Sequence, residues 1–109
     1  MTYKDKLTAI ESFDMMNKDD IYRKLADLLK DRGASKVAVF GSYVKDMENP
    51  DSDIDVIVEF SKRKTLLELV RIEREVSEAL GIKVDLLTEK SISPYMIESI
   101  KNEMRVIYT

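Results

Sequence analysis

Two stretches, KVAVFGS at residues 36–42 and DIDVIVEF at residues 53–60, decide the fold of this 109-residue chain. Each is rich in the β-branched and aromatic residues that favour strands, so each predicts a strand. Gly41-Ser42 ends the first strand and is expected to start a short helical turn over residues 42–47, while two aspartates head the second strand. Because the connection between the two strands is short, we expect them to pair antiparallel.

Helix signals surround these strands. Thr65-Leu66-Leu67-Glu68 has the form of a capping box, in which two side chains satisfy the free N–H groups of a helix start. Further helices are expected after Asn17 and after Ser93-Pro94, and further strands over residues 82–87 and 105–108. The pattern predicts one α/β (α+β) domain, residues 1–109, with a mixed β-sheet of about four strands flanked by helices.

The composition excludes several classes of chemistry. The chain has no His and no Cys, which removes imidazole catalysis, cysteine nucleophiles, thiolate zinc sites and disulfides. Its net charge of −3 argues against sequence-independent binding of nucleic acid. No apolar run reaches the length of a membrane span, and residues 1–14 lack the core of a signal peptide, so we expect a cytoplasmic protein.

Acidic residues are concentrated next to the second strand. Residues 44–59 hold six acids and one base, and Asp53 and Asp55 stand at i and i+2, on one face of a strand. Two carboxylates this close favour a cation between them, and Mg²⁺ prefers such oxygen ligands. A polar strand entry with both aspartates solvated remains the alternative. An EF-hand is excluded, because Val56 and Lys62 stand where that loop needs Gly and Glu.

The spacing of these features resembles a known signature. Gly41-Ser42, ten intervening residues and Asp53-Ile54-Asp55 resemble the motif of the polymerase-β-like nucleotidyltransferase superfamily, and Asp85 matches the third carboxylate of that family. The short chain is similar to the minimal nucleotidyltransferases (MNT proteins), which are commonly antitoxins of HEPN-domain ribonucleases. Many of those proteins carry Arg-Gly after the Gly-Ser motif, where this chain has Lys45-Asp46.

The resemblance implies a role for each of these residues. Asp53, Asp55 and Asp85 would hold two Mg²⁺ ions and carry the catalysis, while Gly41, Ser42 and Lys45 would bind the phosphates of ATP. The implied reaction moves AMP from ATP to a tyrosine hydroxyl of a HEPN ribonuclease toxin, with which the chain would form a hetero-oligomer.

Two alternatives remain for the function. Beside this catalytic antitoxin, the alternatives are a binding-only antitoxin, with catalysis weakened at Lys45-Asp46, and a nucleotidyltransferase for a small-molecule hydroxyl. The second alternative is disfavoured, because almost every residue is needed for the core fold and none is left for a domain that holds an acceptor. Tyr43, beside the Gly-Ser motif, is expected to pack in the core, with self-modification as the alternative.

Overall fold

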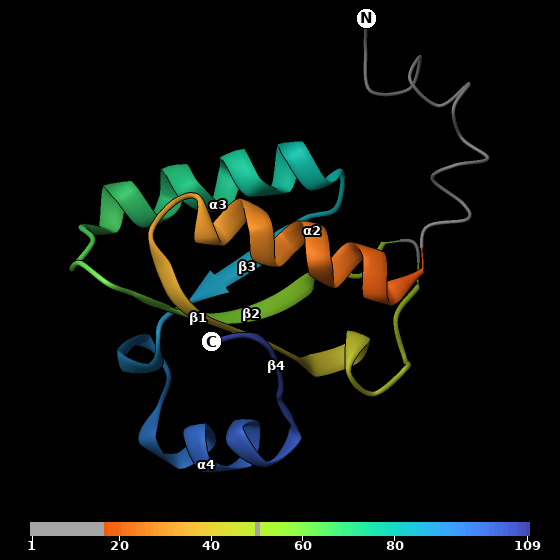
Figure 1. Ribbon diagram of the computed structural model, residues 1–109. Coiled ribbons are helices and arrows are strands. Elements are labelled where there is room, and N and C mark those ends of the chain that lie inside the picture. Colours follow the sequence, from red (N-terminus) through yellow and green to blue (C-terminus); the bar gives the residue numbers. More distant parts are fainter. Residues whose placement is uncertain (1–16, 50) are drawn as a thin grey trace, which may run out of the picture.

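The computed structural model describes residues 17–49 and 51–109, and it contains a four-stranded mixed sheet with the order β3-β2-β1-β4 (Figure 1). β1 pairs antiparallel with β2 and with β4, whereas β2 and β3 are parallel. The strands are β1 (Ala34–Phe40), β2 (Ile54–Phe60), β3 (Val84–Leu87) and β4 (Arg105–Tyr108). The expected mixed sheet is confirmed, as is the antiparallel pairing of its first two strands. The prediction about a signal peptide concerns residues outside the described part of the chain.

The helices cover the sheet unequally. Helices α2 and α3 lie on one face and α4 lies on the other, where, among the residues that the structure describes, it covers only part of the sheet (Figure 1). Their bounds are α2 (Lys18–Lys30), α3 (Leu66–Leu80) and α4 (Pro94–Glu103). The predicted caps are present: the Asn17 side chain accepts from the Asp20 N–H, and Thr65 and Glu68 form the complete capping box. None of the helices in residues 17–49 and 51–109 is long and apolar enough to cross a membrane.

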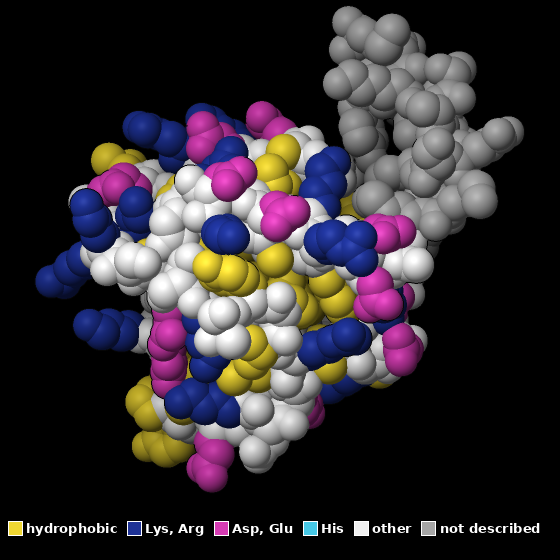
Figure 2. Space-filling model, in the orientation of Figure 1, with side chains coloured by type: hydrophobic (Ala, Val, Ile, Leu, Met, Phe, Trp, Pro, Cys, Tyr) yellow, Lys and Arg dark blue, Asp and Glu magenta, His cyan; other side chains and the backbone are white. Residues whose placement is uncertain are grey.

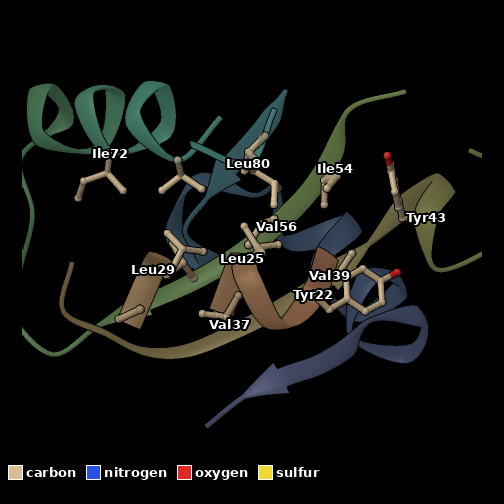
Figure 3. Packing of buried hydrophobic residues seen from close by; sticks show 14 residues of the cluster. Tyr22, Leu25, Leu29, Val37, Val39, Tyr43, Ile54, Val56, Ile72 and Leu80 are labelled. Carbon is tan, nitrogen blue, oxygen red and sulfur yellow. The ribbon is translucent and has the colours of Figure 1, made fainter. Parts of the chain in front are cut away.

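The hydrophobic core lies between the sheet and the pair α2–α3 (Figure 3). Along β2, Ile54, Val56 and Val58 are buried in this core, so the alternate residues Asp55 and Ile57 lie on the opposite face. Helices α2 and α3 add a stripe of buried side chains at helical spacing. This stripe consists of Tyr22, Leu25, Leu29, Ile72, Val76 and Leu80.

The helical turn after β1 is shorter than expected. Only Gly41–Tyr43 forms a helical turn, of the 3₁₀ type, and residues 44–46 continue as a hydrogen-bonded turn. Tyr43 is 7 % exposed and belongs to the core, so the packing interpretation of this tyrosine is confirmed. Likewise, β3 begins at Val84 rather than at residue 82.

Candidate active site on the open face of the sheet

Gly41 and Asp55 are in direct contact where β1 ends and β2 begins. Phe40, the last residue of β1, pairs with Asp55 across the sheet. Gly41 has a φ of +78°, and a Cβ atom at this position would lie 2.2 Å from Oδ2 of Asp55. No other residue type fits this contact without movement, because a side chain here would meet the carboxylate and strain the backbone. The glycine therefore permits the carboxylate to lie against the chain turn.

Asp85 lies beside Asp55, on the side opposite to Gly41. The parallel register of β2 and β3 pairs Asp55 with Asp85, so both side chains leave the same face of the sheet. Burial raises the pKa of the Asp55 carboxyl above its usual range, and the charges of Asp85 and Asp53 and a hydrogen bond with Asp85 raise it further. Gly41, Asp55 and Asp85 thus form a row across the sheet, at right angles to the strands.

Asp53 completes the acidic group and has a basic partner of its own. This residue precedes β2, and its Oδ2 atom lies 3.6 Å from Nζ of Lys83 in an ion pair. Its charge still acts on Asp55, as the pKa of Asp55 reflects. Within residues 17–49 and 51–109, no three acidic side chains already converge on one metal position.

The group nevertheless has the properties that a hard cation requires. Its donors are carboxylate oxygens, which Mg²⁺ prefers, and Asp55 carries a raised pKa that a bound cation would reverse. The residues present therefore fit Mg²⁺, and Asp53 would exchange Lys83 for the ion when the ion binds.

Lys18 of α2 holds the loop of residues 41–48, which we call the Gly-Ser loop. Its Nζ donates to the Tyr43 carbonyl oxygen at 2.7 Å and forms ion pairs with Asp46 and with Glu48, the latter at 2.9 Å. The hydrogen bond from Lys18 lowers the pKa of both carboxyls. The sequence analysis missed this contact. The acid excess of residues 44–59 signals that a cation must come from elsewhere, but it does not identify which one.

Asp46 and Lys45 occupy the positions where many MNT proteins have Gly and Arg. Asp46 has a φ of +56°, the left-handed conformation that Gly adopts freely and that Asp tolerates better than most residues. Nζ of Lys45 lies 3.3 Å from Oε2 of Glu103, so Lys45 joins the Gly-Ser loop to the end of α4. The structure therefore brings Asp53, Asp55, Asp85 and Gly41 together and gives Lys45 an acidic partner outside that group.

Charges of both signs are interspersed on one face of the molecule (Figure 2). Figure 2 shows Lys and Arg side chains interspersed with Asp and Glu and with small apolar patches on the face in view.

Comparison with known proteins identifies relatives of similar length. Residues 22–107 match the family described as nucleotidyltransferase domain. A candidate protein adenylyltransferase of Methanocaldococcus jannaschii is 43 % identical over 88 residues, which cover 81 % of this chain and 95 % of that protein.

Solved structures share the fold. A candidate minimal nucleotidyltransferase is 31 % identical, with a TM-score of 0.67, over 77 % of this chain and 86 % of its own. A toxin–antitoxin structure with AMP-PNP has a TM-score of 0.72 at 22 % identity, covering 80 % of this chain and 72 % of its own. An MNT antitoxin in complex with a tri-AMPylated HEPN toxin of Shewanella oneidensis has a TM-score of 0.65 at 21 % identity, covering 81 % and 69 %.

Proposed function

Because the chain belongs to the nucleotidyltransferase domain family and is a nucleotidyltransferase, we propose that it transfers AMP from ATP to a tyrosine hydroxyl of a HEPN-type ribonuclease toxin. The observation that carries the proposal is the row of Gly41, Asp55 and Asp85, with Asp53 beside it, on the open face of the sheet. By neutralising the toxin, the protein acts as its antitoxin.

Each part of the row has a role in this reaction. Asp53, Asp55 and Asp85 would hold Mg²⁺, and Gly41 and Ser42 contact the β- and γ-phosphates from the start of the Gly-Ser loop. Bound at these carboxylates, Mg²⁺ supplies positive charge that neutralises phosphate oxygens and acidifies a hydroxyl. Lys45 adds a positive charge near the triphosphate when it exchanges Glu103 for phosphate oxygens.

The reaction is an in-line displacement at the α-phosphorus. The tyrosine oxygen forms a bond to the α-phosphorus, and the bond from that phosphorus to the bridging oxygen of the β-phosphate breaks, which releases pyrophosphate. The hydroxyl proton passes to a carboxylate of the Asp55–Asp85 pair. A tyrosine suits this site because its hydroxyl has a pKa of about 10, far below that of an aliphatic alcohol, and the chain has no His to act as a base.

The choice of partner is supported by the relatives. The M. jannaschii protein is named as a candidate protein adenylyltransferase, and the S. oneidensis structure contains an AMPylated HEPN toxin bound to an MNT antitoxin. The AMP-PNP complex supports ATP as the donor. AMP attached to a tyrosine adds a bulky anion, which can occupy an RNA-cleaving site and repel the phosphates of RNA. We expect a hetero-oligomer, in which the toxin brings the acceptor.

The test is intact-mass spectrometry of the co-purified toxin after incubation with this protein, ATP and Mg²⁺. We expect the mass to rise by one or more AMP units and the ribonuclease activity to fall. Asp53→Asn and Asp85→Asn should abolish the added mass, while Asp51→Asn serves as a matched control because Asp51 is an exposed aspartate of the same acidic stretch. Inhibition without added mass, unchanged by Asp53→Asn, would instead favour a binding-only antitoxin.

A further inference from the structure

A hollow of about 200 Å³ lies between the sheet and α4. Ala38 of β1 and Ile57 of β2 line it on the sheet side, and Ile97 of α4 and Met104 just after this helix line it from the opposite side. Helix α4 packs loosely, since Ile100 is its one buried residue. Ala38 and Ile57 are almost completely buried, 1 % and 8 % exposed, so they form the floor of the hollow, while Ile97 and Met104 form its apolar wall.

The hollow shares its face of the sheet with the candidate active site. Asp55 and Ile57 are two residues apart on β2 and so point to the same side, about 7 Å apart along the strand. On β1, Ala38 likewise lies two residues before Phe40, which pairs with Asp55. The hollow thus begins two residues along the strands from the row of Gly41, Asp55 and Asp85.

The geometry of phosphoryl transfer assigns different directions to the parts of the nucleotide. In an in-line displacement, the attacking oxygen and the leaving pyrophosphate lie on opposite sides of the phosphorus. With the pyrophosphate at Gly41 and the acceptor at Asp85, this axis follows the row across the sheet. The 5′-oxygen of the nucleoside is one of three remaining oxygens on this phosphorus, all roughly perpendicular to the axis, so it can point along the strands. On the side of Ile57, that direction leads into the hollow.

We propose that this hollow binds the nucleoside half of the donor nucleotide. This inference rests on the proposed function, because it places the nucleoside relative to the transferred phosphate. The purine ring lies over the floor formed by Ala38 and Ile57 and against the side chains of Ile97 and Met104. Helix α4 is then a nucleotide-binding element rather than a part of the core.

Charged side chains border the apolar surfaces. Glu89 and Lys101 form an ion pair at one side of the hollow, and Lys36 and Glu59 line it from the sheet. Carboxylates accept from an exocyclic amino group or from ribose hydroxyls, and ammonium groups donate to ring nitrogens. This lining suits a purine with both donors and acceptors on its edge.

The experiment measures the affinity of the full chain for Mg-ATP and for Mg-tripolyphosphate by isothermal titration calorimetry. Ile97→Trp fills the hollow from the loosely packed helix, so we expect the Kd for ATP to rise roughly tenfold or more while that for tripolyphosphate stays within about twofold. Met96→Trp is the matched control, because Met96 is the neighbouring residue, does not line the hollow and is 58 % exposed. It should change neither affinity.

A second measurement does not depend on a variant. Photolabelling of the wild-type protein with 8-azido-ATP should modify peptides that contain residues 36–38, 57–59 or 94–104, and an excess of ATP should suppress the labelling. Labelling confined to other segments would overturn the proposal.

The outcomes separate this inference from the proposed function. Unchanged ATP affinity in Ile97→Trp overturns the proposal that the hollow binds the nucleoside. If that variant keeps its ATP affinity but also loses AMP transfer, the hollow would be assigned to the acceptor instead. Equal loss of both affinities also overturns it, since the nucleoside would not be what the hollow contacts. If wild type binds neither ATP nor tripolyphosphate with Mg²⁺, the proposed nucleotidyl transfer itself fails.

Discussion

The contact between Gly41 and Asp55 predicts a specific energetic coupling. Gly41→Ala places a Cβ atom 2.2 Å from Oδ2 of Asp55 and forces a residue with a side chain to keep a φ of +78°. The left-handed backbone costs about 1 kcal/mol for Ala relative to Gly. Moving the carboxylate costs a further ~1–3 kcal/mol, the usual cost of overpacking. We therefore expect Gly41→Ala to reduce the free energy of unfolding by about 2–4 kcal/mol.

Gly33→Ala isolates the backbone part of this cost. Gly33 has a φ of +94°, and the nearest atom to an added Cβ is Nζ of Lys64 at 4.0 Å, so no clash accompanies the strained conformation. We expect this variant to lose only about 1 kcal/mol. The same loss is expected for Gly41→Ala in a protein that already carries Asp55→Ala, because the clashing carboxylate is absent there.

Urea unfolding of the four variants and wild type, followed by circular dichroism in the presence of EDTA, measures the cycle. The coupling between Gly41→Ala and Asp55→Ala should be about 1–3 kcal/mol. Additive effects of the two substitutions, or equal losses for Gly41→Ala and Gly33→Ala, would refute the contact as the reason for glycine at residue 41.

Three further predictions follow from the same contacts. Asp55→Asn should stabilise the metal-free protein at pH 7, because the pKa of Asp55 is raised in the folded state. The stabilising contribution of the protonated Asp55 is present at acid pH and is lost as the pH rises from 3.8 through the folded pKa. Urea unfolding between pH 4 and 7 should show this loss in wild type and not in the variant. Lys18→Met should destabilise the Gly-Ser loop at neutral pH, where Asp46 and Glu48 are charged. Because Lys18 lowers the pKa values of both carboxyls, the difference from wild type should shrink as the pH falls through those values. Hydrogen exchange of residues 43–48 measures this difference, and equal protection in both proteins would contradict the role of Lys18. Asp85→Asn should keep ATP affinity in calorimetry and lose roughly 10²- to 10⁴-fold in the rate of transfer, whereas full transfer would mean that another carboxylate accepts the proton.

The sequence predicted the parts of the site that are close along a strand or fixed by strand pairing. Gly41 and Asp55 could be predicted to lie close together, because they stand at the ends of two adjacent strands. Asp85 was assigned by resemblance, and the parallel register of β2 and β3 places it beside Asp55. Caps at Asn17 and Thr65 were predictable because they depend on residues within one turn.

Contacts between distant segments could not be predicted in the same way. Lys18 and Asp46 are 28 residues apart, and nothing in the sequence distinguishes Lys18 from the other basic side chains. The ion pair between Lys45 and Glu103 depends on where α4 crosses the sheet. The hollow beneath α4 has no sequence signal either, because an amphipathic pattern predicts which face of a helix is buried but not how closely it approaches.

The crowded carboxylates also bear on the lifetime of the protein in the cell. Without a cation, Asp55 is half-buried beside two other acids, which makes the ligand-free fold less stable than its core alone would allow. A ligand that binds only the folded chain adds RT ln(1 + [L]/Kd), about 2.7 kcal/mol at a hundredfold excess over Kd. If the proposed nucleotide and Mg²⁺ are such ligands, their depletion would leave a larger fraction of the chain unfolded and accessible to proteases. The abundance of the protein would then follow the energy state of the cell.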